Sequence, residues 1–223
     1  MAIFALSDLH LPLGINKPMD VFGVRWDNYV EKIEYEWKRL VTDEDCVIIN
    51  GDFSWATYLS ESLADFRFID ALPGKKLISK GNHDYWWETL KKMNEFLLDC
   101  NIGNVTFMQN NAVLYDGVAV CGAKGWISPV DKTLKKEDDK IYRREMIRLE
   151  ASLKEASALS ETIIAALHFP PDDAYSEILE KYAVKACVFG HLHGKRAEDF
   201  RSNHQNYHLV SADFLKFAPK RII

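Results

Sequence analysis

The chain has 223 residues, of which 48% are hydrophobic and 27% carry a charged side chain. These proportions are ordinary for a folded, water-soluble protein, and no stretch is long and apolar enough to predict a membrane-spanning helix. The net charge of -5 argues against a broad surface for nonspecific nucleic-acid binding, although it is compatible with a local basic groove. We expect a single domain over residues 1–223, because the length suits one α/β domain and no stretch is typical of a linker.

The N-terminal residues and the cysteines indicate the cellular compartment in which the protein works. The chain enters an apolar run at once, with no basic stretch and no small-residue cleavage site ahead of it, so we expect a cytoplasmic protein rather than a secreted one. The cysteines lie far apart and form no Cys-x-x-Cys pair. Buried free thiols in a reducing compartment are therefore favoured over disulfides or a zinc site, the cysteines being Cys46, Cys100, Cys121 and Cys187.

The first half of the chain alternates between apolar runs and amphipathic stretches. The run at residues 2–7 is typical of a central strand, and residues 11–25 carry prolines and glycines without periodicity, which predicts a functional or mobile loop. Short apolar runs indicate further strands, and apolar side chains on one face of a helical period indicate helices. We expect strands at 46–49 and 75–79 and helices at 26–41, 58–71 and 85–99.

Beyond Cys100 short strands follow one another closely. Asp116-Gly117 separates two of them and is a strong hairpin signal, so we expect a second, more antiparallel sheet. The charged segment 131–140 is expected to be a solvated surface loop, and residues 141–159 an amphipathic helix. The remaining expected elements are strands at 105–108, 112–115, 118–121, 162–167 and 184–189, a helix at 174–182, and closing strands at 207–210 and 214–217.

Five of the expected strands end in polar clusters. Residues two apart in a strand share a face, so Asp8 and His10 can converge on one point. Each cluster taken alone also fits an Asx turn with a solvated histidine. However, five of the seven histidines fall in these clusters, and strands running parallel in one sheet would bring the clusters together along one edge. The clusters are Asp8 with His10, Asp52, Asn82-His83-Asp84, His168, and His191 with His193.

The donor atoms in these clusters indicate a metal site. Oxygen atoms of Asp and Asn combined with imidazole nitrogens suit borderline divalent ions such as Mn, Fe or Zn better than Mg or Ca. Two such ions about 3.5 to 4 Å apart can convert a shared water into hydroxide and hold the oxygens of a phosphoryl group. The sequence therefore predicts two divalent metal ions and a small phosphate ester as the substrate.

The ordered motifs resemble those of the calcineurin-like metallophosphoesterase family. The resemblance is specific because five motifs, each weak alone, occur in order behind apolar runs between the first residues and residue 193. It implies an α/β fold with four layers, an α-β-β-α sandwich in which two mixed sheets pack face to face. The motifs are Asp8-Leu9-His10, Gly51-Asp52, Gly81-Asn82-His83-Asp84, His168 and Gly190-His191-Leu192-His193.

The same resemblance implies a role for each residue. Asp52 would bridge the two ions. His83 would touch the phosphate from outside the metal ligands and protonate the leaving oxygen, and Asp84 would fix the tautomer and orientation of the His83 imidazole. One ion would be held by Asp8, His10 and His193, and the other by Asn82, His168 and His191.

The chain departs from one branch of the superfamily. Protein Ser/Thr phosphatases place an Asp-Arg-Gly element after the bridging aspartate and Glu after the catalytic His, whereas this chain has Phe53-Ser54-Trp55 and Asp84 there. It resembles the smaller bacterial-type phosphohydrolases and phosphodiesterases instead. Basic and aromatic side chains near the motifs are candidates for contacting the substrate, with solvation or core packing as the alternatives. They are foremost Arg25, Trp55 and Arg196, followed by Lys124, Lys195, Tyr85, Trp86 and Trp126.

The resulting expectation is a metal-dependent phosphoesterase that hydrolyses a phosphomonoester or a phosphodiester with His83 as the acid. One alternative is a catalytically silent metal-binding scaffold for protein interactions, like the retromer subunit with this fold, but that subunit lacks the imidazole corresponding to His83. Another alternative is a nuclease, against which the acidic net charge argues. Nucleic acid and membrane partners are disfavoured, and no oligomeric state is indicated.

Overall fold

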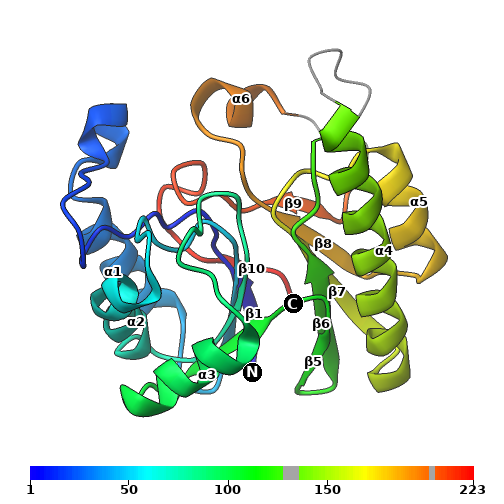
Figure 1. The fold of residues 1–223 in the computed structure, drawn as a ribbon, viewed down its shortest axis with the longest axis horizontal. Helices are drawn as coiled ribbons and strands as arrows, with labels where there is room; N and C mark the ends of the chain where they lie inside the picture. The colour runs from blue at the N-terminus through cyan, green and yellow to red at the C-terminus, as the bar shows by residue number, and fades with distance from the viewer. Residues whose placement is uncertain (128–135, 201–203) are drawn as a thin grey trace.

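Two five-stranded sheets face each other in the computed structural model, which describes residues 1–127, 136–200 and 204–223 (Figure 1). The first sheet has the order β10 (Lys220–Arg221), β1 (Ile3–Ala5), β2 (Cys46–Asn50), β3 (Lys75–Ser79) and β4 (Val105–Met108). The second has the order β5 (Ala112–Tyr115), β6 (Val118–Ala123), β7 (Thr162–Leu167), β8 (Ala186–Phe189) and β9 (Tyr207–Leu209). Each sheet is parallel apart from one edge strand, β10 in the first and β5 in the second.

Helices cover the outer side of each sheet, so the chain forms four layers (Figure 1). On the first sheet lie α1 (Tyr29–Leu40), α2 (Leu63–Asp70) and α3 (Leu90–Asp99), together with the short 3-10 helices η1 (Asp20–Phe22), η2 (Val24–Trp26) and η3 (Leu59–Ser62). On the second lie α4 (Lys136–Leu159), α5 (Asp173–Lys181) and α6 (Gly194–Asp199). The expected α-β-β-α sandwich of two mixed sheets is confirmed.

The burial pattern follows from the periods of the two element types. In α1 the buried residues Tyr29, Ile33 and Trp37 are four apart, which places them on one face of the helix against the sheet. In β2 the side chains alternate, so Val47 packs under the helices while Ile48 packs between the two sheets. The layer between the sheets is therefore built from apolar side chains of both sheets.

The second sheet differs from the sequence-based expectation. We expected a more antiparallel sheet containing residues 105–108, but β4 pairs in parallel with β3 in the first sheet. Only β5 and β6, which flank Asp116-Gly117, form an antiparallel hairpin there. The turn residues Asp116-Gly117 determined the antiparallel pairing of β5 with β6. The helices α4 and α5 connect β6 to β7 and β7 to β8, and these strands pair in parallel.

Three expected element boundaries were also wrong. The helix expected from residue 85 begins at Leu90, because the Thr89 side chain caps it by accepting a hydrogen bond from the Lys92 N–H (3.4 Å). Residues 136–140, expected in a loop, form the start of α4, while 131–135 lie outside the described residues. Residues 214–217 form turns rather than a strand, since Lys216 and Phe217 have φ values of 53° and 66°. Within the described residues, no helix combines the length and the apolar character needed to cross a membrane.

A candidate metal centre between the two sheets

The polar clusters meet at one end of the sandwich, but they come from two sheets rather than one. Asp8 and His10 follow β1, and Asp52 and Asn82 follow β2 and β3 of the first sheet. The remaining candidate ligands follow β7 and β8 of the second sheet, and they are His168, His191 and His193. The expectation of a single sheet edge was therefore wrong, although the carboxyl ends of the parallel strands do converge.

The backbone at these strand ends is strained. Positive φ angles are uncommon for residues other than glycine and cluster at functional sites. The neighbouring loops hold this conformation, because the Asp8 N–H donates to the Gly51 carbonyl and the His10 N–H to the Asp52 carbonyl, both at 3.0 Å. The left-handed residues among the candidate ligands are Asp8 (56°), His10 (47°), Asp52 (51°) and His191 (69°).

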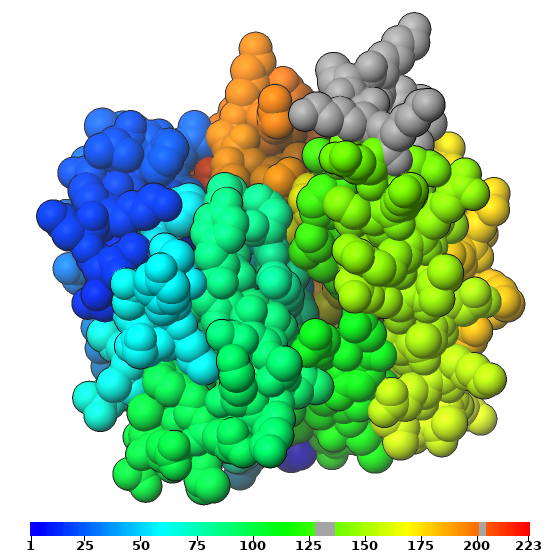
Figure 2. Space-filling view, in the orientation of Figure 1, coloured from blue at the N-terminus to red at the C-terminus, as the bar shows by residue number. Residues whose placement is uncertain are grey.

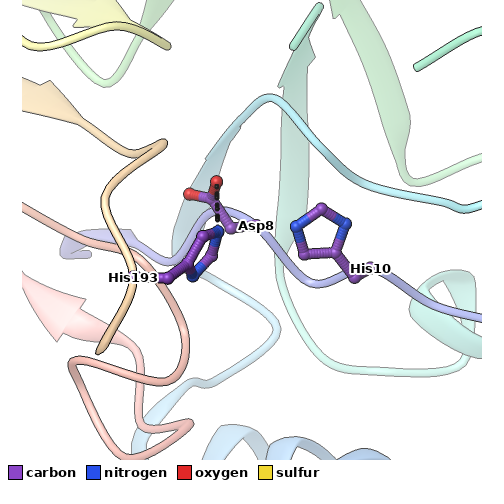
Figure 3. A group of neighbouring side chains, drawn as sticks. All are labelled: Asp8, His10 and His193. Carbon is purple, nitrogen blue, oxygen red and sulfur yellow. Dashed lines mark ion pairs between the residues drawn. The ribbon is translucent and has the colours of Figure 1, made fainter. Parts of the chain in front are cut away.

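The first group of donors consists of Asp8, His10 and His193. One side-chain donor atom from each lies within 4.8 Å of the others. The His193 Nε2 is 3.4 Å from the Asp8 Oδ1, and Figure 3 shows this ion pair beside the His10 ring. The His10 Nδ1 is buried and has no hydrogen-bond partner among the described residues. An unpartnered buried imidazole nitrogen beside a buried carboxylate fits a bound cation.

The second group of donors surrounds the Asn82 amide oxygen. This oxygen is 2.7 Å from the His168 Nε2 and 2.9 Å from the His191 Nδ1. The Asp52 Oδ2 lies 3.4 Å from the His168 Nε2 and 3.8 Å from the His10 Nε2, so its carboxylate stands between the two groups. The oxygen and nitrogen donors of both groups fit one or more borderline divalent cations.

The carboxylates of the site favour their ionised forms. Burial alone would raise the pKa of Asp52, but the neighbouring His168 charge and hydrogen bond hold it well below its usual range. Burial likewise opposes ionisation of Asp8, yet the hydrogen bond from His193 keeps the pKa of Asp8 lowered. Two buried anions therefore attract positive charge into the site.

The imidazoles of the site divide into two classes. Burial lowers the pKa of His10 to about 4 and that of His191 to about 4, so both rings stay neutral. Burial also disfavours charge on His168 and His193, but contact with the carboxylates outweighs it and raises their pKa values to about 9 and about 10. Protons on these two rings balance the buried carboxylates, a role that a cation can take over.

Asp84 does not have the place expected for it. Its buried carboxylate accepts hydrogen bonds from the backbone N–H groups of Asp52 (2.9 Å), Phe53 (2.9 Å) and Gly81 (2.7 Å), and from the Trp86 Nε1 (3.0 Å). None of its described hydrogen bonds reaches the His83 ring, so the predicted role in orienting that imidazole is corrected. Asp84 instead ties the loop after β2 to the loop after β3, and burial raises its pKa to about 6.

His83 stands at the edge of the ligand groups. Its backbone N–H donates to the Asp52 Oδ1 at 2.7 Å, and its ring lies edge-on to the Trp55 ring with 4.9 Å between centroids. Burial lowers the pKa of His83, so the neutral ring is favoured in the absence of an anion. His83 lines a cavity of about 400 Å³, which the nearly buried His10 and Asp52 also line.

Only some of the candidates for contacting the substrate line this cavity. Arg25 and Trp55 line it, together with Met19, Phe22 and Trp26. Arg196 does not line it and lies in an adjacent groove beside His191, Phe169 and Trp126. Of the other candidates, Trp86 is buried in the core, Tyr85 and Lys195 are exposed, and Lys124 stands over the Trp126 ring.

Asp213 is a site residue that the sequence did not reveal. Its Oδ1 accepts a hydrogen bond at 2.8 Å from the His193 Nδ1, while its Oδ2 lies 3.4 Å from the Arg25 guanidinium. The hydrogen bond determines which His193 nitrogen is free to face Asp8. The available signal was a carboxylate shortly after the strand next to β8, but Asp213 belongs to no motif.

Comparisons with known proteins agree with this geometry. A family model described as calcineurin-like phosphoesterase matches residues 1–195, whereas no curated protein matches the chain. The fold is similar to that of a protein of unknown function, AQ665 from Aquifex aeolicus, at 16% identity and a TM-score of 0.55, covering 99% of this chain and 95% of that one. It is also similar to TT1561 of Thermus thermophilus, at 14% identity and a TM-score of 0.58, covering 98% and 96%.

A third similar structure is GAP50, named as the anchor in the inner membrane complex of Plasmodium, at 12% identity and a TM-score of 0.52, covering 96% of this chain and 72% of that one. These low identities show the shared fold alone. The family match is more informative, because residues 1–195 contain all seven predicted ligands and His83. The chain belongs to the calcineurin-like phosphoesterase family.

Proposed function

We propose that this protein is a phosphoesterase that hydrolyses a small phosphate ester with two divalent metal ions. The observation that carries the proposal is the convergence of two donor groups on the Asp52 carboxylate, with His83 at the wall of an open cavity. A scaffold that only bound metal would not need a free imidazole facing that cavity. The chemistry of the donors favours Mn, Fe or Zn.

Each donor group would hold one ion. Asp8, His10 and His193 would bind the first, Asn82, His168 and His191 the second, and Asp52 both. Bound ions would supply Lewis acidity toward the phosphoryl oxygens and an activated water. Asp213 would keep the His193 ring oriented, through the hydrogen bond to its Nδ1.

The remaining residues would bind and protonate the ester. His83 would donate a proton to the leaving oxygen, and a bound phosphate would favour that protonated form because an anion offsets the burial that lowers its pKa. Arg25 is oriented by Asp213 at 3.4 Å and Glu198 at 3.9 Å, so its guanidinium can meet the phosphate without a large loss of side-chain entropy. Trp26, Phe22 and Met19 form an apolar wall that favours an ester with a flat or apolar group.

The test is hydrolysis of p-nitrophenyl phosphate and bis(p-nitrophenyl) phosphate by protein loaded with Mn. We expect His83→Ala to lower kcat by about 10² to 10⁴-fold, the range of general acid catalysis, with the bound metal unchanged. The matched control is His204→Ala, which removes a histidine that stacks on the Tyr207 ring beside a cavity lined by no motif residue, and it should leave kcat unaltered. Equal rates in wild type and His83→Ala would overturn the proposal, and two inactive proteins with full metal content would favour a scaffold.

A further inference from the structure

A second cavity lies beside the metal centre and shares none of its lining residues. It has a volume of about 330 Å³, within the range of small-molecule sites. Its walls come from the ends of β3 and β4, the end of β6 and one face of α4. Figure 2 shows the segment after β3 and the N-terminal half of α4 on the same face of the molecule. We call this cavity the α4 pocket, lined among others by Ser79, Lys80, Trp87, Lys124, Arg144, Glu145 and Arg148.

Three buried polar atoms in this wall have no hydrogen-bond partner among the described residues. They are the Ser79 Oγ, the Trp87 Nε1 and the Glu145 Oε2, from side chains that are 5%, 9% and 1% exposed. Leaving a buried polar group without a partner is unfavourable, so three such groups around one cavity favour the binding of something polar there. The residues that carry these atoms all line the same cavity, and the atoms are a hydroxyl, an indole N–H donor and a carboxylate acceptor.

The charges around the cavity favour an anion. Four basic side chains line it against two acidic ones, Glu88 and Glu145. Both carboxylates are already engaged: the Glu145 Oε1 is 2.5 Å from Arg148, and Glu88 is 3.2 Å from Lys92. Lys80 and Lys124 line the cavity and form no ion pair with a described residue, and the Lys124 ammonium is held 3.9 Å from the centroid of the Trp126 ring.

We infer that the α4 pocket binds a small molecule that carries a phosphate or carboxylate group next to an N–H or O–H donor. The two lysines would meet the oxyanion, and the Trp87 N–H would donate to one of its oxygens. The ligand's own donor would meet the Glu145 Oε2. This binding is independent of the proposed phosphoesterase activity, because no residue of the metal centre takes part in it.

The pocket is nevertheless coupled to the metal centre through the backbone. Lys80 stands two residues before Asn82, and the Lys124 carbonyl accepts a hydrogen bond from the His168 N–H at 3.0 Å. A molecule in the pocket therefore lies against the two loops that present these ligands. Its oxyanion could belong to the remote end of the substrate or to a separate molecule, and the two sources make different kinetic predictions.

The binding test uses the full chain loaded with Zn and labelled with ¹⁵N on its tryptophan indoles, with O-phosphoethanolamine as the probe. We expect a saturable shift of the Trp87 indole resonance, which is identified by its loss in Trp87→Phe. Lys80→Met combined with Lys124→Met should raise the Kd at least about tenfold, or about 1.4 kcal/mol. The matched control Lys38→Met, on the opposite side of the fold in α1, should leave the Kd unchanged.

The wild-type titration alone can overturn the inference, so the result does not depend on a variant folding. A Trp87 resonance that does not move, or that moves equally when sodium chloride is added, would mean that the cavity holds only solvent. A saturable shift with an unaltered Kd in the double lysine variant would also refute the inferred contacts.

The source of the oxyanion is separated by inhibition of p-nitrophenyl phosphate hydrolysis by fructose 1,6-bisphosphate. If the pocket takes the remote phosphate of a substrate, the double lysine variant should raise the Ki at least about tenfold while the KM for p-nitrophenyl phosphate stays constant. If the pocket takes a separate molecule, Ki and KM stay constant and only O-phosphoethanolamine binding is lost. Both results support the site, and inactivity of the protein would leave the binding test intact.

Discussion

The carboxylate of Asp84 is hydrogen-bonded to the backbone of the two loops that carry the candidate metal ligands Asp52 and Asn82. Its acceptor atoms serve the N–H groups of Asp52, Phe53 and Gly81 and the Trp86 indole. A charged acceptor suits several converging donors, and the neutral amide of asparagine would oppose one or more of them with its own N–H. At the scale of one residue, Asp84 thus stabilises the positions of Asp52 and Asn82 rather than the His83 proton.

Asp84→Asn is therefore expected to act on stability and on metal binding together. Loss of a charged acceptor for buried N–H groups should lower the free energy of unfolding by about 2 to 3 kcal/mol. Urea unfolding and bound-metal analysis measure the two effects, with Asp99→Asn at the exposed end of α3 as the matched control. A variant of unaltered stability whose pH–rate profile alone has moved would instead restore Asp84 as the orienter of His83.

At the scale of the element, the loop after β3 passes so close to the loop after β2 that one glycine is required. A Cβ atom at Gly81 would lie 2.1 Å from the Asp52 Oδ1 and 2.3 Å from the Asp52 N. Neither atom is the end of a flexible side chain, because the Asp52 carboxylate is held by His83 and by the histidine ligands. The loop would have to move away and take Asn82 with it.

Gly81→Ala is expected to weaken metal binding and to lower kcat severely, whereas Gly103→Ala should do neither. Gly103 is the matched control because a Cβ there meets nothing within 4 Å. Metal affinity by competition with a chromogenic chelator, and kcat with p-nitrophenyl phosphate, measure the outcome. Near wild-type metal affinity in Gly81→Ala would show that the two loops do not need this close approach.

Helix α2 carries a buried carboxylate that makes stability depend on pH. Asp65 accepts hydrogen bonds from the Leu13 N–H (2.8 Å) and from the Ser54 hydroxyl (2.5 Å), and burial raises its pKa from 3.8 to about 7. The folded protein therefore binds more protons than the unfolded chain between pH 4 and pH 7. Stability contributed by the protonated form is present at low pH and is lost as the pH rises through 7.

We expect the deprotonation of Asp65 to lower the free energy of unfolding by up to about 4 kcal/mol as the pH rises from 4 to 8. Asp65→Asn keeps the size of the side chain and removes the titration, so its stability should fall less over the same interval. Urea unfolding of both proteins at a series of pH values measures the difference. Parallel curves for the two proteins would contradict a buried, titrating Asp65.

At the scale of the whole molecule, the candidate metal centre joins the two sheets. Asp52 comes from the first sheet and His168 from the second, and a cation held by both would add a link between layers that pack through apolar side chains and through hydrogen bonds such as that from Asn50 to the Leu167 carbonyl. Ligands that bind only the folded state stabilise it by mass action. The metal-free protein keeps its hydrophobic layers and should stay folded at a lower melting temperature.

Chelation should therefore lower Tm and abolish hydrolysis, and added Mn or Zn should restore both. At a free metal concentration about a thousand times the Kd, the stabilisation is about 4 kcal/mol, or roughly 10 °C for a chain of this length. Calorimetry with and without chelator measures it, and Asp52→Asn should show a smaller difference because it removes the shared ligand. A Tm indifferent to metal in the wild type would argue against a site that spans the sheets.

The sequence by itself determined most of the strands and the order of the family motifs. Residues 162–167 form a strand as predicted, because burial on both faces leaves a continuous apolar run, and residues 75–79 also form the predicted strand although only Leu77 and Ile78 are apolar there. Glycines and polar residues directly after these runs likewise mark the strand ends. The family match and the four-layer architecture confirm what these local patterns indicated.

Only the tertiary structure decided which strands pair and which side chains meet. β4 joins the first sheet, Asp84 bonds the backbone, Asp213 holds His193, and the α4 pocket unites residues from both sheets. Each of these contacts joins groups that are far apart in the chain or that compete for one hydrogen-bond acceptor. The free energy that favours one set of contacts over another comes from packing two apolar sheets face to face. Local periodicity carries no information about that choice, so the same strand ends could have met along a single sheet.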